Sequence, residues 1–222
     1  MIDRRVATIE EAVKGILDGS TVLIGGFGEV GTPFELVMGL LEQGARELEL
    51  VLNNAGTAYD AVARLMDAGR VRKVVCSFPR SNLGTPVFDR LYADGKLELE
   101  LVPQGTLAER IRAGSAGIAG FYTPTSVGTR LAHGKEHREF DGRTYVLERP
   151  IVGDIALVKA LKADRWGNLV YHRSARNFGP VMAACGRLTI VQVGEIVELG
   201  TLDPECVVTP GIFVNRVVEL RQ

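Results

Sequence analysis

The sequence predicts an α/β protein whose mostly parallel sheet carries helices on both faces. Short apolar runs alternate with segments whose apolar residues recur three and four positions apart, the spacing of an amphipathic helix. Most of these apolar runs end in glycine, asparagine or proline, the residues that close strands. Strands separated by helices are joined by crossover connections, which place the strands parallel and cover the sheet on both sides.

Each element in the first half of the chain is predicted from one of these two patterns. Continuous apolar runs predict strands over residues 21–24, 48–52, 71–76 and 97–102. Helical periodicity predicts helices over residues 9–17, 34–41, 58–66 and 87–92, and a further helix that opens at 107–111. Three helix starts, at Thr32, Thr57 and Thr106, have an acidic residue three positions later, the signature of a capping box.

The second half of the chain is less regular. Residues 114–129 are rich in glycine and hydroxyl side chains, so we expect a loop that leads into a smaller irregular lobe over residues 114–150. Residues 133–143 are highly charged and expected to be exposed. Beyond Tyr145 we expect shorter strands, with a turn at 164–168, a helix at 174–184 and a strand at 188–193. Residues 1–222 are treated as one domain that includes the lobe.

Composition argues against several classes of function. The 26 basic and 27 acidic residues give a formal net charge of −1 over 222 residues, and no basic run stands out. A nucleic-acid partner or a basic membrane-binding face is therefore not expected. We expect a cytoplasmic protein, because no apolar stretch approaches the roughly 20 residues that span a bilayer and no signal-peptide core opens the chain. The three scattered cysteines fit a reducing compartment, and Cys76 is interpreted as a buried small side chain.

Polar and glycine-rich residues follow the carboxyl end of each predicted strand. These segments are residues 25–28, 53–54, 77–80 and 103–105. Because the carboxyl ends of parallel strands meet at one edge of a sheet, and ligands bind beyond that edge, the four segments predict a shared ligand site.

Residues 26–31 match the pattern G-x-G-x-x-G between a predicted strand and a predicted helix. That pattern is typical of dinucleotide-binding proteins, which also place an acidic residue at the end of the second strand to hold the ribose. Here the second strand ends in Asn53 and Asn54, so a nicotinamide cofactor is not expected. The alternative is that the glycines only permit a tight turn and close packing.

A longer pattern covers the same residues. Residues 18–33 read Asp-Gly-Ser-Thr-Val-Leu-Ile-Gly-Gly-Phe-Gly-Glu-Val-Gly-Thr-Pro. This segment resembles the signature of the first of the two subunits in family I CoA-transferases, which requires the Asp-Gly start, three apolar residues, Gly-Gly-Phe and a later Gly-x-Pro. Further blocks that resemble the family lie at residues 53–56, 103–112, 121–129 and 162–168, so the likeness runs from about residue 9 to 218.

The resemblance implies an enzyme of two subunits that moves coenzyme A between carboxylic acids. In that family a glutamate attacks the acyl-CoA thioester to give an acyl-glutamyl anhydride, and coenzyme A thiolate then forms a glutamyl-CoA thioester. The glutamate belongs to the second subunit, or to the C-terminal half of fused enzymes, and this sequence ends at Gln222 without such a half. We therefore expect a hetero-oligomer with that second subunit. Neither a metal nor a bound organic cofactor is expected, since the coenzyme A thioester is a substrate.

The resemblance also implies roles for individual residues. Gln104 follows a predicted strand directly, and the matching glutamine of the family donates to the oxyanion that develops on the thioester or anhydride. Asn53 and Asn54 match a pair that orients the partner's glutamate. The positions that match the substrate or coenzyme A site are Gly25, Gly26, Phe27, Gly28, Gly31, Arg80 and Gly105. Structural alternatives are that Gln104 caps backbone groups and that the asparagines close a turn.

Arg80 bears on the choice of acceptor. Residues 71–80 and 138–180 resemble the branch of the family that uses 3-oxoadipate, whose second carboxylate a guanidinium can bind with two hydrogen bonds. The resemblance thus implies transfer from succinyl-CoA to 3-oxoadipate, in the breakdown of aromatic acids. One alternative is a surface arginine in an enzyme that uses acetoacetate or another monocarboxylic 3-oxoacid. A non-enzymatic ligand-binding domain on the same scaffold is the alternative from another class.

The weaker candidates are three glutamates, Glu29, Glu195 and Glu198, and three histidines, His133, His137 and His172. A glutamate of this chain could replace the partner's nucleophile, and the alternative is a solvated surface carboxylate. His133 and His137 have the spacing of two metal ligands on a helix, but their surroundings are charged and loop-like and no third ligand is evident. His172 has no visible catalytic partner.

Overall fold

A nine-stranded sheet forms the centre of the protein in the computed structural model, which describes residues 2–57, 60–80 and 84–220. The order is β1-β12-β11-β9-β2-β3-β4-β5, with β10 paired to β9. Within the described residues every pair is parallel except β10 with β9, which confirms the mostly parallel sheet. The strands are β1 Arg5–Val6, β2 Thr21–Ile24, β3 Leu48–Val51, β4 Val71–Cys76, β5 Glu98–Leu101, β9 Gly153–Asp164, β10 Leu169–Val170, β11 Gly186–Val197 and β12 Arg216–Glu219.

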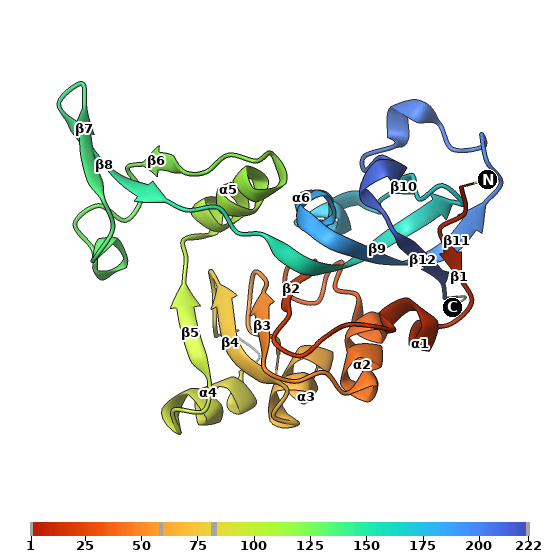
Figure 1. Ribbon diagram of the computed structural model, residues 1–222, viewed down its shortest axis with the longest axis horizontal. Coiled ribbons are helices and arrows are strands. Elements are labelled where there is room, and N and C mark those ends of the chain that lie inside the picture. The colour runs from red at the N-terminus through yellow and green to blue at the C-terminus, as the bar shows by residue number, and fades with distance from the viewer. Residues whose placement is uncertain (1, 58–59, 81–83, 221–222) are drawn as a thin grey trace.

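Helices cover both faces of this sheet (Figure 1). They are α1 Ile9–Val13, α2 Phe34–Gln43, α3 Ala61–Asp67, α4 Pro86–Ala93, α5 Gln104–Ser115 and α6 Gly179–Cys185. Successive residues of a strand point to opposite faces, so Val22 and Ile24 enter the core under α1 to α4, whereas Leu23 enters the core under α5 and α6. Burial on both faces explains why the strands are continuous apolar runs.

The lobe that the sequence led us to expect as irregular is instead built on a three-stranded antiparallel sheet. Its order is β6-β8-β7, with β6 Phe121–Thr123, β7 His137–Phe140 and β8 Arg143–Glu148. The sheet projects away from the main body (Figure 1). Asp141 and Gly142, with φ of 50° and 73°, connect β7 to β8, and an Asp-Gly pair at positive φ is a strong hairpin signal. This signal was overlooked because the surrounding charges indicated a loop.

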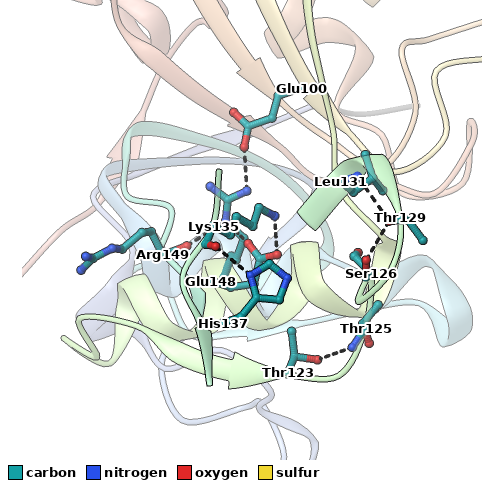
Figure 2. A network of polar contacts seen from close by, with 11 residues as sticks. Glu100, Thr123, Thr125, Ser126, Thr129, Leu131, Lys135, His137, Glu148 and Arg149 are labelled. Atoms are coloured by element: carbon teal, nitrogen blue, oxygen red, sulfur yellow. Dashed lines mark hydrogen bonds and ion pairs between the residues drawn. The ribbon is translucent and has the colours of Figure 1, made fainter. Parts of the chain in front are cut away.

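Arg110 on α5 attaches the lobe to the main body, through a hydrogen bond to the Arg149 carbonyl and an ion pair with Glu148. Within the lobe, the carboxylate of Glu148, which is only 2% exposed, lies 2.5 Å from the Lys135 ammonium (Figure 2). On α5, Arg110 binds Glu100 at 2.7 Å and donates to the carbonyl of Arg149 at 2.7 Å. Burial raises the pKa of Glu100, but hydrogen bonds from Lys73 and Arg110 outweigh it, and the net shift is downward. Through Arg110, helix α5 is thus linked both to Glu100 of the main sheet and to the segment that follows β8 of the small sheet.

Several predicted boundaries were wrong. The helix predicted over residues 9–17 ends at Val13, because the chain turns at Gly15, whose φ is 85°. The helix predicted over 58–66 begins at Ala61, after Asp60 caps it, and residues 58–59 lie outside the described part of the chain. Strands beyond Tyr145 lengthen rather than shorten, since β9 and β11 each have 12 residues.

The three predicted capping boxes do not form as expected. The Thr32 hydroxyl donates to the carbonyl of Gly28, 2.9 Å away, and does not accept a hydrogen bond from the first turn of α2. Asp60, and not Thr57, accepts the hydrogen bond from the first turn of α3. Helix α5 begins at Gln104, two residues before Thr106, which is buried inside the first turn. Within the described residues, no helix is both long and apolar enough to cross a membrane.

Candidate active site

The carboxyl end of β2 leads into a tight turn formed by residues 25–31, which we call the glycine loop. The backbone groups of Phe27 and Val30 bind each other at 3.0 and 3.2 Å, with Gly28 at φ 61° in the first central position. Such a two-residue connection favours glycine at that position. Gly26 has a φ of 126°, and a Cβ there would overlap the Thr32 hydroxyl. The loop therefore needs glycine for its own conformation, whatever it binds.

Asn53 and Asn54 leave β3 side by side but have different partners. Asn54 accepts from the Gly28 N–H at 3.1 Å through Oδ1 and donates to the Gly56 carbonyl at 3.3 Å, so both ends of its amide hold the backbone. Asn53 is 3% exposed and accepts at 2.7 Å from the hydroxyl of Ser77, the residue after β4. Its Nδ2 group makes no hydrogen bond with a described residue. Asn54 thus anchors the glycine loop, whereas Asn53 retains a donor for another group.

Gln104 and the glycine loop meet at one cleft of about 460 Å³. Its lining comes from α5, the start of α6 and the loop: Phe27, Gln104, Gly105, Ala108, Asn177, Phe178 and Val181. Gln104 is the first residue of α5, is exposed, and its side chain binds no described residue. A Cβ on Gly105 would have no neighbour within 4 Å, so the chain's own packing does not require glycine there. The Gln104 amide thus lies at the start of α5, in a cleft whose other lining residues are mainly aromatic and aliphatic.

Arg80 follows β4, the strand next to β5, but it does not line this cleft. Its side chain is 70% exposed and its Nε lies 2.7 Å from a carboxylate oxygen of Asp89 on α4. The structure therefore places Arg80 at the predicted edge of the sheet, paired with an acidic side chain of its own chain. Gly25 is buried, and a Cβ there would lie in ordinary contact with Leu157 and Gly179 of this chain.

None of the three candidate glutamates, Glu29, Glu195 and Glu198, lines the cleft that contains Gln104. Glu29 is exposed at the tip of the glycine loop, and its carboxylate accepts from the Thr57 hydroxyl at 3.2 Å. Glu195 lies within β11, which extends to Val197 and so beyond the strand predicted over 188–193, and it pairs with Lys162 at 2.7 Å. Glu198 is exposed just beyond that strand. Of the three, Glu29 alone belongs to the glycine loop.

The histidines and Cys76 show no catalytic arrangement. His133 follows a short 3₁₀ helix and His137 begins β7, so they do not share a helix face, and within the described residues no three potential ligands gather as a metal site. His172 is exposed next to another 3₁₀ turn. Cys76 is fully buried, and burial raises the pKa of its thiol to about 12. A thiol with that pKa stays protonated near neutral pH, which supports its interpretation as a packed side chain.

The chain matches a known protein family over nearly its whole length. The family model described as coenzyme A transferase matches residues 6–220. The chain belongs to the coenzyme A transferase family. It is 58% identical over 218 residues to the first subunit of 3-oxoadipate CoA-transferase of Pseudomonas putida, covering 98% of this chain and 94% of that protein. It is 47% identical to the first subunit of succinyl-CoA:3-ketoacid coenzyme A transferase of Xanthomonas campestris, covering 97% and 88%.

A solved structure with a coenzyme A-transferase name has the same fold. Glutaconate coenzyme A-transferase from Acidaminococcus fermentans superposes with a TM-score of 0.86 over 98% of this chain and 76% of that chain, at 19% identity. The likeness confirms the α/β architecture inferred from the sequence. Because both relatives found by sequence are named as the first subunit of their enzymes, a second subunit is implied for proteins of this kind.

Four residues that line the cleft were not identified from the sequence: Ala108, Asn177, Phe178 and Val181. The hydrogen bond between Ser77 and Asn53 was not identified either. Asn177 and Phe178 line the cleft although they precede α6, far from the glycine loop in the chain. Ser77 binds Asn53 across neighbouring strands. Ser77 belongs to residues 77–80, which were predicted to follow a strand. Its position was therefore predicted from the sequence, but its hydrogen bond with Asn53 was not. Asn177 carried no signal, because its contact with the loop depends on the folded arrangement.

Proposed function

We propose that this chain is the first subunit of a CoA-transferase that moves coenzyme A from succinyl-CoA to a 3-oxoacid, with 3-oxoadipate as the favoured acceptor. The observation that carries the proposal is the cleft, where the exposed amide of Gln104 faces apolar walls beside the glycine loop. Family membership supplies the reaction class. The higher identity to the 3-oxoadipate protein, 58% against 47%, favours the dicarboxylic acceptor.

In the proposed mechanism the nucleophile is a glutamate of the second subunit, which docks over the cleft in a hetero-oligomer. Its carboxylate attacks the succinyl-CoA carbonyl, and the negative charge that develops on the carbonyl oxygen is stabilised by the Gln104 amide. Coenzyme A leaves as thiolate and the succinyl-glutamyl anhydride forms. The thiolate then attacks the glutamate carbonyl, releases succinate and forms glutamyl-CoA, which transfers coenzyme A to the 3-oxoacid by the same steps in reverse.

The residues of this chain hold and orient groups in that scheme. The available Nδ2 of Asn53 is suited to donate to the partner's glutamate, while Asn54 keeps the glycine loop in place. The chain's proposed contribution requires neither a metal nor a bound organic cofactor, because coenzyme A enters as a substrate. The proposed setting is the cytoplasm, where acyl-CoA pools and reduced thiols coexist.

The test is transfer from succinyl-CoA to 3-oxoadipate, measured with this chain alone and after co-expression with its presumed second subunit. We expect activity only from the pair, since the nucleophile belongs to the partner. A partner whose glutamate is replaced by alanine is the control, and it should assemble with this chain without transferring coenzyme A. Transfer by this chain alone would contradict the split site and make Glu29 the first residue to replace.

The acceptor is tested separately through Arg80. Arg80→Ala should raise KM for 3-oxoadipate more than KM for acetoacetate, because only the first has a second carboxylate for a guanidinium to bind. Asp89→Ala is the matched control: it removes the ion pair of 2.7 Å but keeps the arginine. It should not raise KM for 3-oxoadipate. Equal effects of Arg80→Ala on both acceptors would leave this arginine without a part in specificity.

A further inference from the structure

The segment before α6 touches the glycine loop through one side chain. Asn177 follows the 3₁₀ turn Arg173–Arg176, and its Nδ2 group donates to the carbonyl of Val30 at 2.9 Å. Its Oδ1 accepts from the N–H of Phe178 at 2.6 Å. The same side chain therefore binds the last residue of the loop's turn and the start of α6. Since an N–H can only donate and a carbonyl only accept, these two partners fix the orientation of the amide.

This contact is close, and the backbone is unusual on both sides of it. Asn177 has a φ of 20° and a ψ of −115°, outside the regions that non-glycine residues ordinarily adopt. On the loop side, Gly31 has a φ of 77°, and a Cβ there would overlap the carbonyl oxygen of Ala175. Strained residues persist where the surrounding structure holds them, and they gather at functional sites.

Two asparagines hold the glycine loop from opposite sides. Asn54, after β3, binds Gly28 at the tip of the turn, and Asn177, before α6, binds Val30 at its end. Phe27 directly precedes Gly28 and pairs with Val30 across the turn. It is 48% exposed and lines the cleft together with Gln104 and Asn177. The hydrogen bonds at Gly28 and Val30 thus hold the turn to which Phe27 belongs, and with it the aromatic side of the cleft that also contains Gln104.

We propose that Asn177 is a positioning residue that fixes the glycine loop, and with it Phe27, as the wall of the cleft that receives the acyl-CoA thioester. The identity of that ligand rests on the proposed function. The wall excludes water from the anhydride and the glutamyl-CoA thioester, both of which water would hydrolyse. When the loop moves, water attacks the glutamyl-CoA carbonyl, coenzyme A leaves as the thiol and the glutamate is regenerated. Transfer is then lost to hydrolysis.

The decisive variant is Asn177→Asp in the complex with the second subunit. Aspartate keeps the acceptor for the Phe178 N–H but places an oxygen, in place of the donor, against the Val30 carbonyl. We expect kcat/KM for transfer to fall roughly tenfold, as for loss of one hydrogen bond, and the hydrolysed share of succinyl-CoA to rise. Hydrogen exchange of the backbone amides of residues 28–31 should accelerate. Asn215→Asp is the matched control, because Asn215 also accepts a backbone N–H, that of Thr189 at 2.7 Å, away from the cleft.

Two outcomes overturn the proposal. One is unchanged hydrogen exchange at residues 28–31 in Asn177→Asp, a measurement that does not require an active enzyme and so also stands if the proposed function fails. The other comes from Asn177→Gly, which relieves the unusual backbone angles and also removes the amide. If Asn177→Gly transfers coenzyme A as well as the unaltered pair, the side chain does not position the loop. Asn177→Gly also replaces Asn177→Asp in the exchange measurement if the latter does not fold.

Discussion

Replacing Gln104 with alanine should lower turnover of the two-subunit enzyme by about 10²-fold or more, the effect of losing one oxyanion donor. The side chain begins α5, is exposed at the cleft and binds no described residue of its own chain. Its amide is therefore available for the charge that develops on the thioester carbonyl. The measurement is kcat for transfer from succinyl-CoA to 3-oxoadipate.

The same variant should leave the protein folded and assembled, because the amide stabilises nothing else that the structure describes. Thermal unfolding and co-purification with the second subunit should match those of the unaltered chain. Gln104→Glu is the shape-matched companion: it replaces the donor by a carboxylate that repels an oxyanion, so turnover should fall at least as far. A normal kcat in a correctly assembled Gln104→Ala pair would remove this residue from the mechanism.

The largest loss of stability is expected from Gly114→Ala, near the end of α5. Alanine in place of glycine normally stabilises a helix by about 1 kcal/mol. Here a Cβ would overlap the backbone carbonyl oxygen of Ile151, on the connection that leads from the lobe into β9, and would press on Cys185. Neither the helix nor a backbone carbonyl yields easily, so we expect the free energy of unfolding to fall by about 3 kcal/mol. Chemical denaturation monitored by circular dichroism measures it.

Gly105→Ala, at the other end of the same helix, is the matched control. Nothing lies within 4 Å of the added carbon, so the free energy of unfolding should stay equal or rise slightly. Because Gly105 lines the cleft, its variant should instead raise KM for succinyl-CoA. If both variants unfold at the same denaturant concentration, the close contact of α5 with Ile151 does not limit stability.

The sequence was sufficient for the parts of the fold that local patterns determine. The runs at β2 and β4 were bounded correctly, because buried strands have uninterrupted apolar residues that stop at polar or glycine positions. Gln104 was placed at the ligand edge because it follows β5 after only two intervening residues. Helix ends were less accurate, since Gly15 and Asp60 stop or start helices through backbone angles and caps that compete with apolar spacing.

What the sequence could not supply were contacts between distant segments. Asn177 meets Val30 across 147 positions of the chain, and Ser77 meets Asn53 across 24. Neither pair has a local pattern, because hydrogen bonds between neighbouring elements depend on sheet order and on how α6 packs. The small antiparallel sheet was overlooked for a different reason: β7 is exposed along its whole length and mostly charged, and β8 begins and ends with a charged residue, so neither has the clear apolar alternation that identifies half-buried strands.

The position of Arg110 has a mechanical consequence. Helix α5 spans 12 residues, and a helix of that length is a stiff rod about 18 Å long. Gln104 lies at one end of the rod, while Arg110, farther along it, is bound to Glu100 and to the backbone of Arg149. The projecting sheet is therefore mechanically coupled, through the contact of Arg110 with Arg149, to the helix that begins at Gln104.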